Sequence, residues 1–182
     1  GTPDEITPEK WLLKYMAAEI DCVAVTDHNS GAWIDGLKAA YAEMKAQADA
    51  GTPPAGFREI TIFPGVEISA NGGAHVLALF DPSATTSDID SLLGAVGFPT
   101  QLRGVTDSAD AAAVTRASLT QVLEEVFRAG AIPIPAHADS GSGLLCVNPG
   151  TRQSALSANT VKQALEVEGL LAVEWCDLNN PY

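Results

Sequence analysis

The chain has 182 residues, of which 46% are hydrophobic and 18% charged, a composition typical of one globular domain with a packed core. A net charge of −13 disfavours direct binding to the phosphate backbone of a nucleic acid. No apolar run approaches the roughly 20 residues that span a membrane, so we expect no membrane partner.

The cysteines are three in number, far apart in the chain and in no Cys-x-x-Cys spacing: Cys22, Cys146 and Cys176. This usage is typical of reduced thiols in a cytoplasmic protein. Because Cys22 and Cys176 lie in or beside apolar segments, we expect both to be buried in the core.

The first part of the chain alternates helical and strand patterns. Thr7-Pro8 predicts a helix start, since threonine caps helices and proline fits their first turn. The apolar run Cys22–Val25 predicts a short buried strand, which ends abruptly in Thr26-Asp27-His28-Asn29. Residues 32–49 predict a second helix, with Trp33 among its inward residues.

The next segment predicts a β-hairpin. Residues 60–63 and 66–69 are strand-like, with an interruption at Pro64-Gly65, and a turn signal at 71–73 leads into a strand over 75–80. A hairpin loop of odd length would place Glu67 and His75 on one face, whereas an even length would separate them. Since a glutamate in an apolar strand is costly unless it is paired or binds metal, Glu67 is a candidate functional residue.

The second part of the chain continues the alternation. Helical spacing predicts helices over 86–96, from Ser118 to Gly130 with Phe127 inward, and from Ser157 to Gly169. Residues 97–115 and the glycine-rich stretch 140–143 predict irregular connections. Strands are expected over 131–136, where Pro133 and Pro135 favour a place at a sheet edge, and over 170–173.

This order of elements predicts an α/β fold with a parallel or mixed sheet. His28 and His137 then follow strand carboxyl ends, and His75 lies on the hairpin beside Glu67. Imidazole and carboxylate are the ligands of hydrolytic zinc, manganese or iron sites, in which the metal lowers the pKa of a bound water towards about 7. The pattern therefore predicts a metal site, with three further carboxylates near strand ends: Asp27, Asp139 and Glu174.

Five motifs, in this order, resemble those of the PHP (polymerase and histidinol phosphatase) family. They are Val-Thr-Asp-His-Asn at 25–29, Pro-Gly-Val-Glu-Ile at 64–68, His-Val-Leu-Ala-Leu-Phe at 75–80, Pro-Ala-His at 135–137 and Ala-Val-Glu at 172–174. The resemblance implies a distorted (β/α)7 barrel. It also implies two or three divalent metal ions (zinc, manganese or iron) that hydrolyse phosphoesters at the strand carboxyl ends.

Carried over by position, the resemblance implies four metal ligands: His28, Glu67, His75 and His137. It implies catalytic roles for Asp27, His28 and Glu67, and leaves Asp27, Asp139 and Glu174 as candidates to support the ligands. The substrate would be a small phosphorylated compound or a nucleotide.

The chain departs from the family pattern at both ends. The His-x-His motif that opens PHP domains and the Asp-x-His motif that closes them are missing. We therefore expect residues 1–182 to be a single PHP-like domain that is incomplete at both ends, and two outcomes stay open for it alone: weak metal binding or no activity. The spacing also resembles PHP domains fused to a C-terminal ATPase, although this chain has no Walker motif.

Three functions stay open at this point. The first is a metal-dependent phosphoesterase. The second is a non-catalytic PHP-like module attached to another activity. The third is an amidohydrolase-type enzyme acting on C–N bonds, which normally needs a bridging lysine that these strand ends do not offer.

Overall fold

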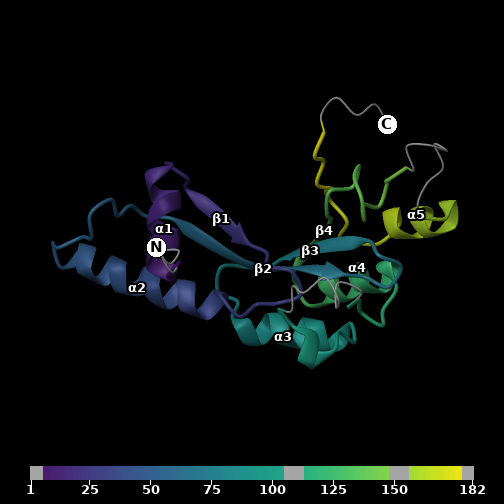
Figure 1. Cartoon of the computed structure of the whole chain (residues 1–182), viewed down its shortest axis with the longest axis horizontal. Coiled ribbons are helices and arrows are strands. Elements are labelled where there is room, and N and C mark those ends of the chain that lie inside the picture. The colour runs from purple at the N-terminus through teal and green to yellow at the C-terminus, as the bar shows by residue number, and fades with distance from the viewer. Residues whose placement is uncertain (1–5, 105–112, 148–155, 178–182) are drawn as a thin grey trace, which may run out of the picture.

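The computed structural model describes residues 6–104, 113–147 and 156–177. They form a mixed α/β fold in which helices and strands follow one another along the chain (Figure 1). The elements are α1 Pro8–Ala17, β1 Cys22–Val25, α2 Ile34–Asp49, β2 Thr61–Ser69, β3 His75–Leu79, α3 Thr86–Ala95, a 3-10 turn η1 Thr100–Leu102, α4 Leu119–Arg128, β4 Ile132–Pro135 and α5 Ala158–Leu165.

The four strands form one open sheet in the order β1-β2-β3-β4. β1 runs parallel to β2, whereas β3 is antiparallel to both β2 and β4. The mixed sheet confirms the predicted fold class. The resemblance implied a distorted (β/α)7 barrel that is incomplete at both ends in this segment. The described strands form an open sheet and no closed barrel, because β1 and β4 stand at opposite ends of the strand order and do not pair.

β2 runs between the part of the molecule formed by α1, α2 and β1 and the part formed by the remaining helices and strands (Figure 1). Its first four residues, Thr61–Pro64, pair with β1, and its last five, Gly65–Ser69, pair with β3. The expected interruption at Pro64-Gly65 is therefore wrong. The dipeptide marks a change of partner within one continuous strand, at a point where Pro64 still accepts a hydrogen bond from Phe80 N at 2.8 Å through its carbonyl oxygen.

The core includes buried residues of α1 and α2, such as Leu12 and Leu37, and next to β3 it lies between the sheet and helices α3 and α4. Along β2 and β3, Val66, Ile68, Val76 and Ala78 are fully buried on the helix side. Because successive strand residues point to opposite faces, Glu67 and its neighbours two residues away lie on the face without these helices. Burial of one face thus leaves the other face free for polar side chains.

The helix starts follow the local signals in the sequence. Thr7 Oγ1 accepts a hydrogen bond from Lys10 N, Ser118 Oγ from Gln121 N, and Ser157 Oγ from Thr160 N. Gly130 and Gly169, expected to end helices, both have positive φ angles, 79° and 85°. No described helix has the length and apolar character needed to cross a membrane.

Some burial expectations are wrong. Cys22 and Cys176 are exposed, because β1 lies at the open end of the sheet and residues 170–173, predicted as a strand, join no ladder. Trp33 and Phe127, expected to face inward, are 37% and 44% exposed. Each of these errors concerns a residue at the margin of the sheet or of a helix face.

Candidate metal centre

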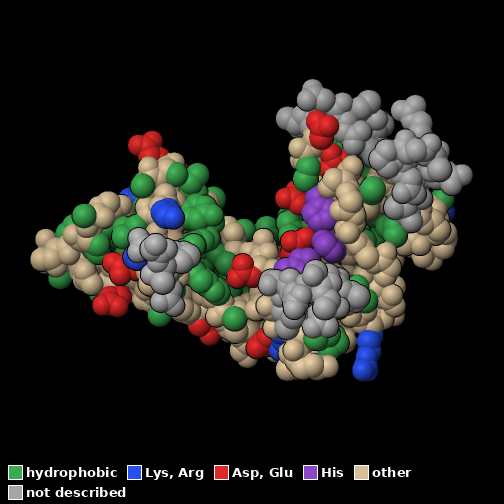
Figure 2. All heavy atoms as spheres, viewed as in Figure 1, with side chains coloured by type: hydrophobic (Ala, Val, Ile, Leu, Met, Phe, Trp, Pro, Cys, Tyr) green, Lys and Arg blue, Asp and Glu red, His purple; other side chains and the backbone are tan. Residues whose placement is uncertain are grey.

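One edge of the sheet collects all four predicted ligands. β1, β2 and β4 run in one direction and β3 runs in the other. His28 follows the end of β1, Glu67 lies near the end of β2, His75 is the first residue of β3, and His137 follows the end of β4. Figure 2 shows the histidine side chains together on one wall of a hollow in the surface, with acidic side chains beside them.

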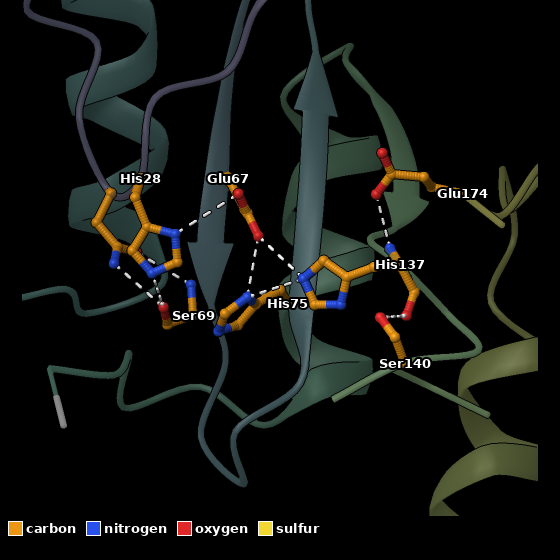
Figure 3. Close-up of polar contacts among 8 residues, drawn as sticks. His28, Glu67, Ser69, His75, His137, Ser140 and Glu174 are labelled. Atoms are coloured by element: carbon orange, nitrogen blue, oxygen red, sulfur yellow. Dashed lines mark hydrogen bonds and ion pairs between the residues drawn. The ribbon is translucent and has the colours of Figure 1, made fainter. Parts of the chain in front are cut away.

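Glu67 lies at the centre of this group (Figure 3). Its Oε1 is 2.9 Å from His75 Nδ1 and 3.2 Å from His137 Nε2, and these two nitrogens are 3.2 Å apart. Its Oε2 is 3.6 Å from His28 Nδ1. The two carboxylate oxygens therefore face different histidines.

The hairpin register answers the question that the sequence left open. Ser69 pairs with His75, so five residues separate the paired positions, and the loop is of odd length. Glu67 and His75 consequently share a face and approach each other diagonally across the two strands. Positive φ angles at Gly72 and Gly73, 102° and 86°, allow the tight turn.

The position of His28 depends on a short continuation of the parallel pairing beyond β1. Glu67 N donates to Asp27 O at 3.1 Å, and Asn29 N donates to Glu67 O at 2.7 Å. These bonds place His28 beside Glu67 as an isolated β-bridge. A residue outside the regular strand is thereby fixed against the central carboxylate.

The site favours the ionised form of Glu67. The imidazoles of His28 and His75 hold the pKa of this carboxyl far below its ordinary value, although burial opposes the shift. Asp27 is exposed as a whole residue, but partial burial of its carboxyl raises its pKa above the usual value. No lysine or arginine forms an ion pair with Glu67 among the described residues, so histidines alone surround its charge.

The donor set fits a divalent cation. Ligands around a tetrahedral zinc ion with bonds of about 2.0–2.1 Å are about 3.3 Å apart. The three distances among Glu67 Oε1, His75 Nδ1 and His137 Nε2, 2.9 to 3.2 Å, are close to that spacing. His28, Glu67 and His75 also each offer one ligand atom, and these three atoms lie within 4.8 Å of one another. Two histidines with one glutamate is a known ligand set of catalytic zinc.

The three further carboxylates have different surroundings. Glu174 Oε2 accepts a hydrogen bond from His137 N at 2.7 Å, so this residue contacts the backbone of a candidate ligand (Figure 3). Asp139 instead accepts bonds from Cys176 N and Asp177 N. Asp27 is exposed, and its carboxylate forms no hydrogen bond to the cluster within the described part of the chain.

Sequence reasoning missed two polar residues beside the cluster. Ser69 Oγ lies 2.8 Å from His28 Nε2, and Asn29 Nδ2 donates to the same Oγ at 3.2 Å. The alternation of β2 carried a signal for Ser69, because residues 67 and 69 of one strand must share a face. Asn29 carried no comparable signal, since its position depends on contacts with the distant β2.

Comparison with known proteins finds only distant structural similarity. No family model and no curated protein matches the chain. A solved structure of a provisionally assigned metal-dependent phosphoesterase from Bifidobacterium adolescentis aligns with 93% of this chain and 72% of its own, at 19% identity and a TM-score of 0.49. An amidohydrolase from Chromobacterium violaceum, with bound sulfate and no metal, aligns with 92% of this chain and 71% of its own, at 17% identity and a TM-score of 0.46. The site is therefore interpreted from its own residues.

Proposed function

We propose that this chain carries the metal-binding site of a hydrolase that acts on phosphoesters. The observation that supports the proposal is the position of Glu67, whose two oxygens face His75 and His137 on one side and His28 on the other. A carboxylate placed in this way can bind two cations at once. The PHP-like motifs add the expectation of two or three ions in a distorted barrel.

Each residue of the site has a proposed role. His75, His137 and Glu67 Oε1 would hold one cation, and His28 with Glu67 Oε2 would contribute to a second. Bound divalent cations supply Lewis acidity and bring the pKa of a coordinated water towards about 7. Glu67 stays ionised through its histidine neighbours and is therefore ready to bind cations without first losing a proton.

The surroundings favour a substrate that is bound through cations. The chain has 23 acidic and 10 basic residues, and no described basic side chain pairs with the central carboxylate. A phosphate group would then depend on the metal ions for charge neutralisation. We propose a small phosphorylated compound or a nucleotide as the substrate. Asp27, next to His28 in the chain, is proposed as a catalytic residue on the family resemblance.

The test is phosphate release by the protein extended at both ends of residues 1–182, after metal removal and reloading with Zn²⁺, Mn²⁺ or Fe²⁺. Substrates would include p-nitrophenyl phosphate, a phosphodiester and nucleotides, and an amide would serve as the C–N comparison. We expect metal-stimulated phosphoester hydrolysis that Glu67→Gln lowers by more than about 100-fold, the upper end of what loss of a residue supporting a metal site costs. Glu124→Gln, the same substitution on the exposed face of α4, is the matched control.

Metal binding without any hydrolysis would instead support the non-catalytic module. Hydrolysis of the amide alone would support the amidohydrolase type of enzyme. Phosphoester hydrolysis that is unchanged in Glu67→Gln would contradict the proposed site.

A further inference from the structure

A buried polar pair supports only one of the three histidines. Ser69 and Asn29 are each 4% exposed, and Ser69 lies beside the ring of His28 (Figure 3). Ser69 Oγ is 2.8 Å from His28 Nε2. His137, by contrast, has a buried Nδ1 that forms no hydrogen bond among the described residues.

The pair is locked by two bonds in opposite directions. Asn29 Nδ2 donates to Ser69 Oγ at 3.2 Å, and Ser69 N donates to Asn29 Oδ1 at 3.0 Å. The backbone of Asn29 is also fixed, because its N–H donates to Glu67 O at 2.7 Å. Its φ of 51° lies in the left-handed region, which asparagine tolerates better than most residues. The amide therefore cannot turn away without loss of several buried bonds.

After these bonds, Ser69 Oγ still has one lone pair and its own hydrogen to offer to His28 Nε2, so the tautomer of His28 depends on the surroundings of Nδ1. A serine hydroxyl has two acceptor lone pairs and one hydrogen. One lone pair accepts from Asn29 Nδ2, and the other can accept a proton carried on His28 Nε2. The opposite tautomer would put the proton on His28 Nδ1, which is 3.6 Å from Glu67 Oε2 and too distant for a good hydrogen bond.

We propose that Ser69, locked by Asn29, is a positioning residue that holds the Nε2 proton of His28 and thereby presents the Nδ1 lone pair beside Glu67 Oε2 as a cation ligand. Histidine ligands commonly donate their second ring N–H to a fixed acceptor, which orients the ring and sets the tautomer. The inference rests on the proposed function, because it assumes that a cation binds at this carboxylate.

The first test needs no metal and no variant. In metal-free protein at a pH where the imidazoles are neutral, ¹⁵N NMR of the histidine side chains reports the tautomer of each ring. We expect His28 to carry its proton on Nε2 in the wild type and to become a mixture of tautomers in Ser69→Ala. A wild-type His28 with its proton on Nδ1 overturns the proposal.

The second test is the dissociation constant of Zn²⁺, measured by calorimetry. We expect Ser69→Ala to weaken binding by about 10- to 100-fold, the range for residues that support metal ligands. Ser69→Thr keeps the hydroxyl and should restore most of the affinity. Asn29→Ala, which leaves the serine but unlocks it, should fall between the two. Ser91→Ala removes a hydroxyl on α3 that bonds only to Ser87 O, and it should bind as the wild type does.

The outcomes separate this proposal from the proposed function. A wild type that binds no Zn²⁺ while His28 keeps its Nε2 proton overturns the proposed function. Wild-type Zn²⁺ binding that is unchanged in a folded Ser69→Ala variant overturns the role of Ser69 alone. Thermal unfolding of each variant shows whether a loss of affinity comes from a loss of fold.

Discussion

At the scale of single residues, Glu67 is held in a charged state by its neighbours. Its side chain is 22% exposed, and three imidazoles surround it within 3.6 Å. A carboxylate in such a place contributes to folding only while it remains ionised in the native state. The site therefore links the stability of the fold to acid conditions, even before any cation binds.

The metal-free protein should lose the stabilising contribution of Glu67 in acid. In the unfolded chain this carboxyl titrates near its ordinary pKa of 4.5, whereas the histidines keep its native pKa far lower. Below about pH 4.5 the unfolded state therefore takes up a proton that the native state does not. The contribution of Glu67 is complete above that pH and decreases as the pH falls, by at most about 1.4 kcal/mol per unit.

The measurement is urea unfolding of the wild type and of Glu67→Gln, with a chelator present, at several pH values below about 5. We expect the difference in unfolding free energy between the two proteins to shrink as the pH falls, because glutamine does not titrate. Two curves that stay parallel throughout this acid range would show that the native pKa of Glu67 is ordinary.

Residue types and spacing were enough to select the four members of the cluster, since imidazoles and a carboxylate at strand ends are uncommon without a role. They were not enough to find Ser69 and Asn29. Hydroxyl and amide side chains occur widely at turns and strand ends, and only the contact with His28 distinguishes these two.

At the scale of elements, β2 determines the geometry of the site. It pairs with β1 on one side and β3 on the other, and so brings His28 and His75 to the same carboxylate. The change of partner falls at Gly65. A Cβ atom there would lie 2.8 Å from Ala78 O and 2.9 Å from Thr26 Cγ2, so no larger residue fits without a backbone shift.

Gly65→Ala should therefore destabilise the protein by about 1–3 kcal/mol, the usual cost of overpacking a filled site. Gly141→Ala is the matched control, because a Cβ at that glycine meets nothing within 4 Å and should change stability by less than about 0.5 kcal/mol. Chemical denaturation of both variants is the measurement. Equal stability of the two variants would mean that the backbones of β2 and β3 move apart around the extra methyl group at little cost.

Local signals predicted the helices better than the strands. Capping residues such as Thr7, Ser118 and Ser157 act within one turn, so the sequence contains all the information needed. Strand formation depends on partners far along the chain. The segment 170–173 has a strand-like sequence but joins no ladder, and Pro64-Gly65 looks like a break but lies within a strand.

At the scale of the whole molecule, the cluster joins four segments that are distant in sequence. They follow β1, lie in β2, begin β3 and follow β4. The sequence predicted their meeting because strands that run in the same direction end at the same edge of a sheet. It predicted a barrel that is incomplete at both ends, but not how many strands the described residues would form or that the two end strands would stay unpaired with each other. Closure depends on whether terminal strands find partners, which residue patterns do not encode locally.

The segment after α5 forms no strand and is held to this edge by backbone bonds of Glu174 and by the carboxylates of Glu174 and Asp139. Glu174 N donates to Pro135 O at 3.0 Å, and Glu174 O accepts from Ala138 N at 2.7 Å. Asp139, only 9% exposed, accepts hydrogen bonds from Cys176 N at 2.9 Å and Asp177 N at 2.8 Å. The Glu174 carboxylate thus binds the turn at His137 N, and the Asp139 carboxylate of that turn binds the segment at Cys176 N and Asp177 N.

Asp139→Ala should release residues 174–177 and destabilise the protein by about 2 kcal/mol or more, since each hydrogen bond to a charged group contributes about 1.5–3 kcal/mol. Hydrogen exchange should show faster exchange at the amides of Cys176 and Asp177, and urea unfolding should give the loss of stability. Asp49→Ala on α2 removes a carboxylate whose one ion pair among the described residues is with Lys45 at the surface, and its effect should stay below about 1 kcal/mol. Unchanged exchange at Cys176 in Asp139→Ala would mean that Glu174 alone holds the segment.

Asp139→Ala should also weaken Zn²⁺ binding if the turn needs both carboxylates to keep His137 in place, because Glu174 of the released segment bonds to His137 N.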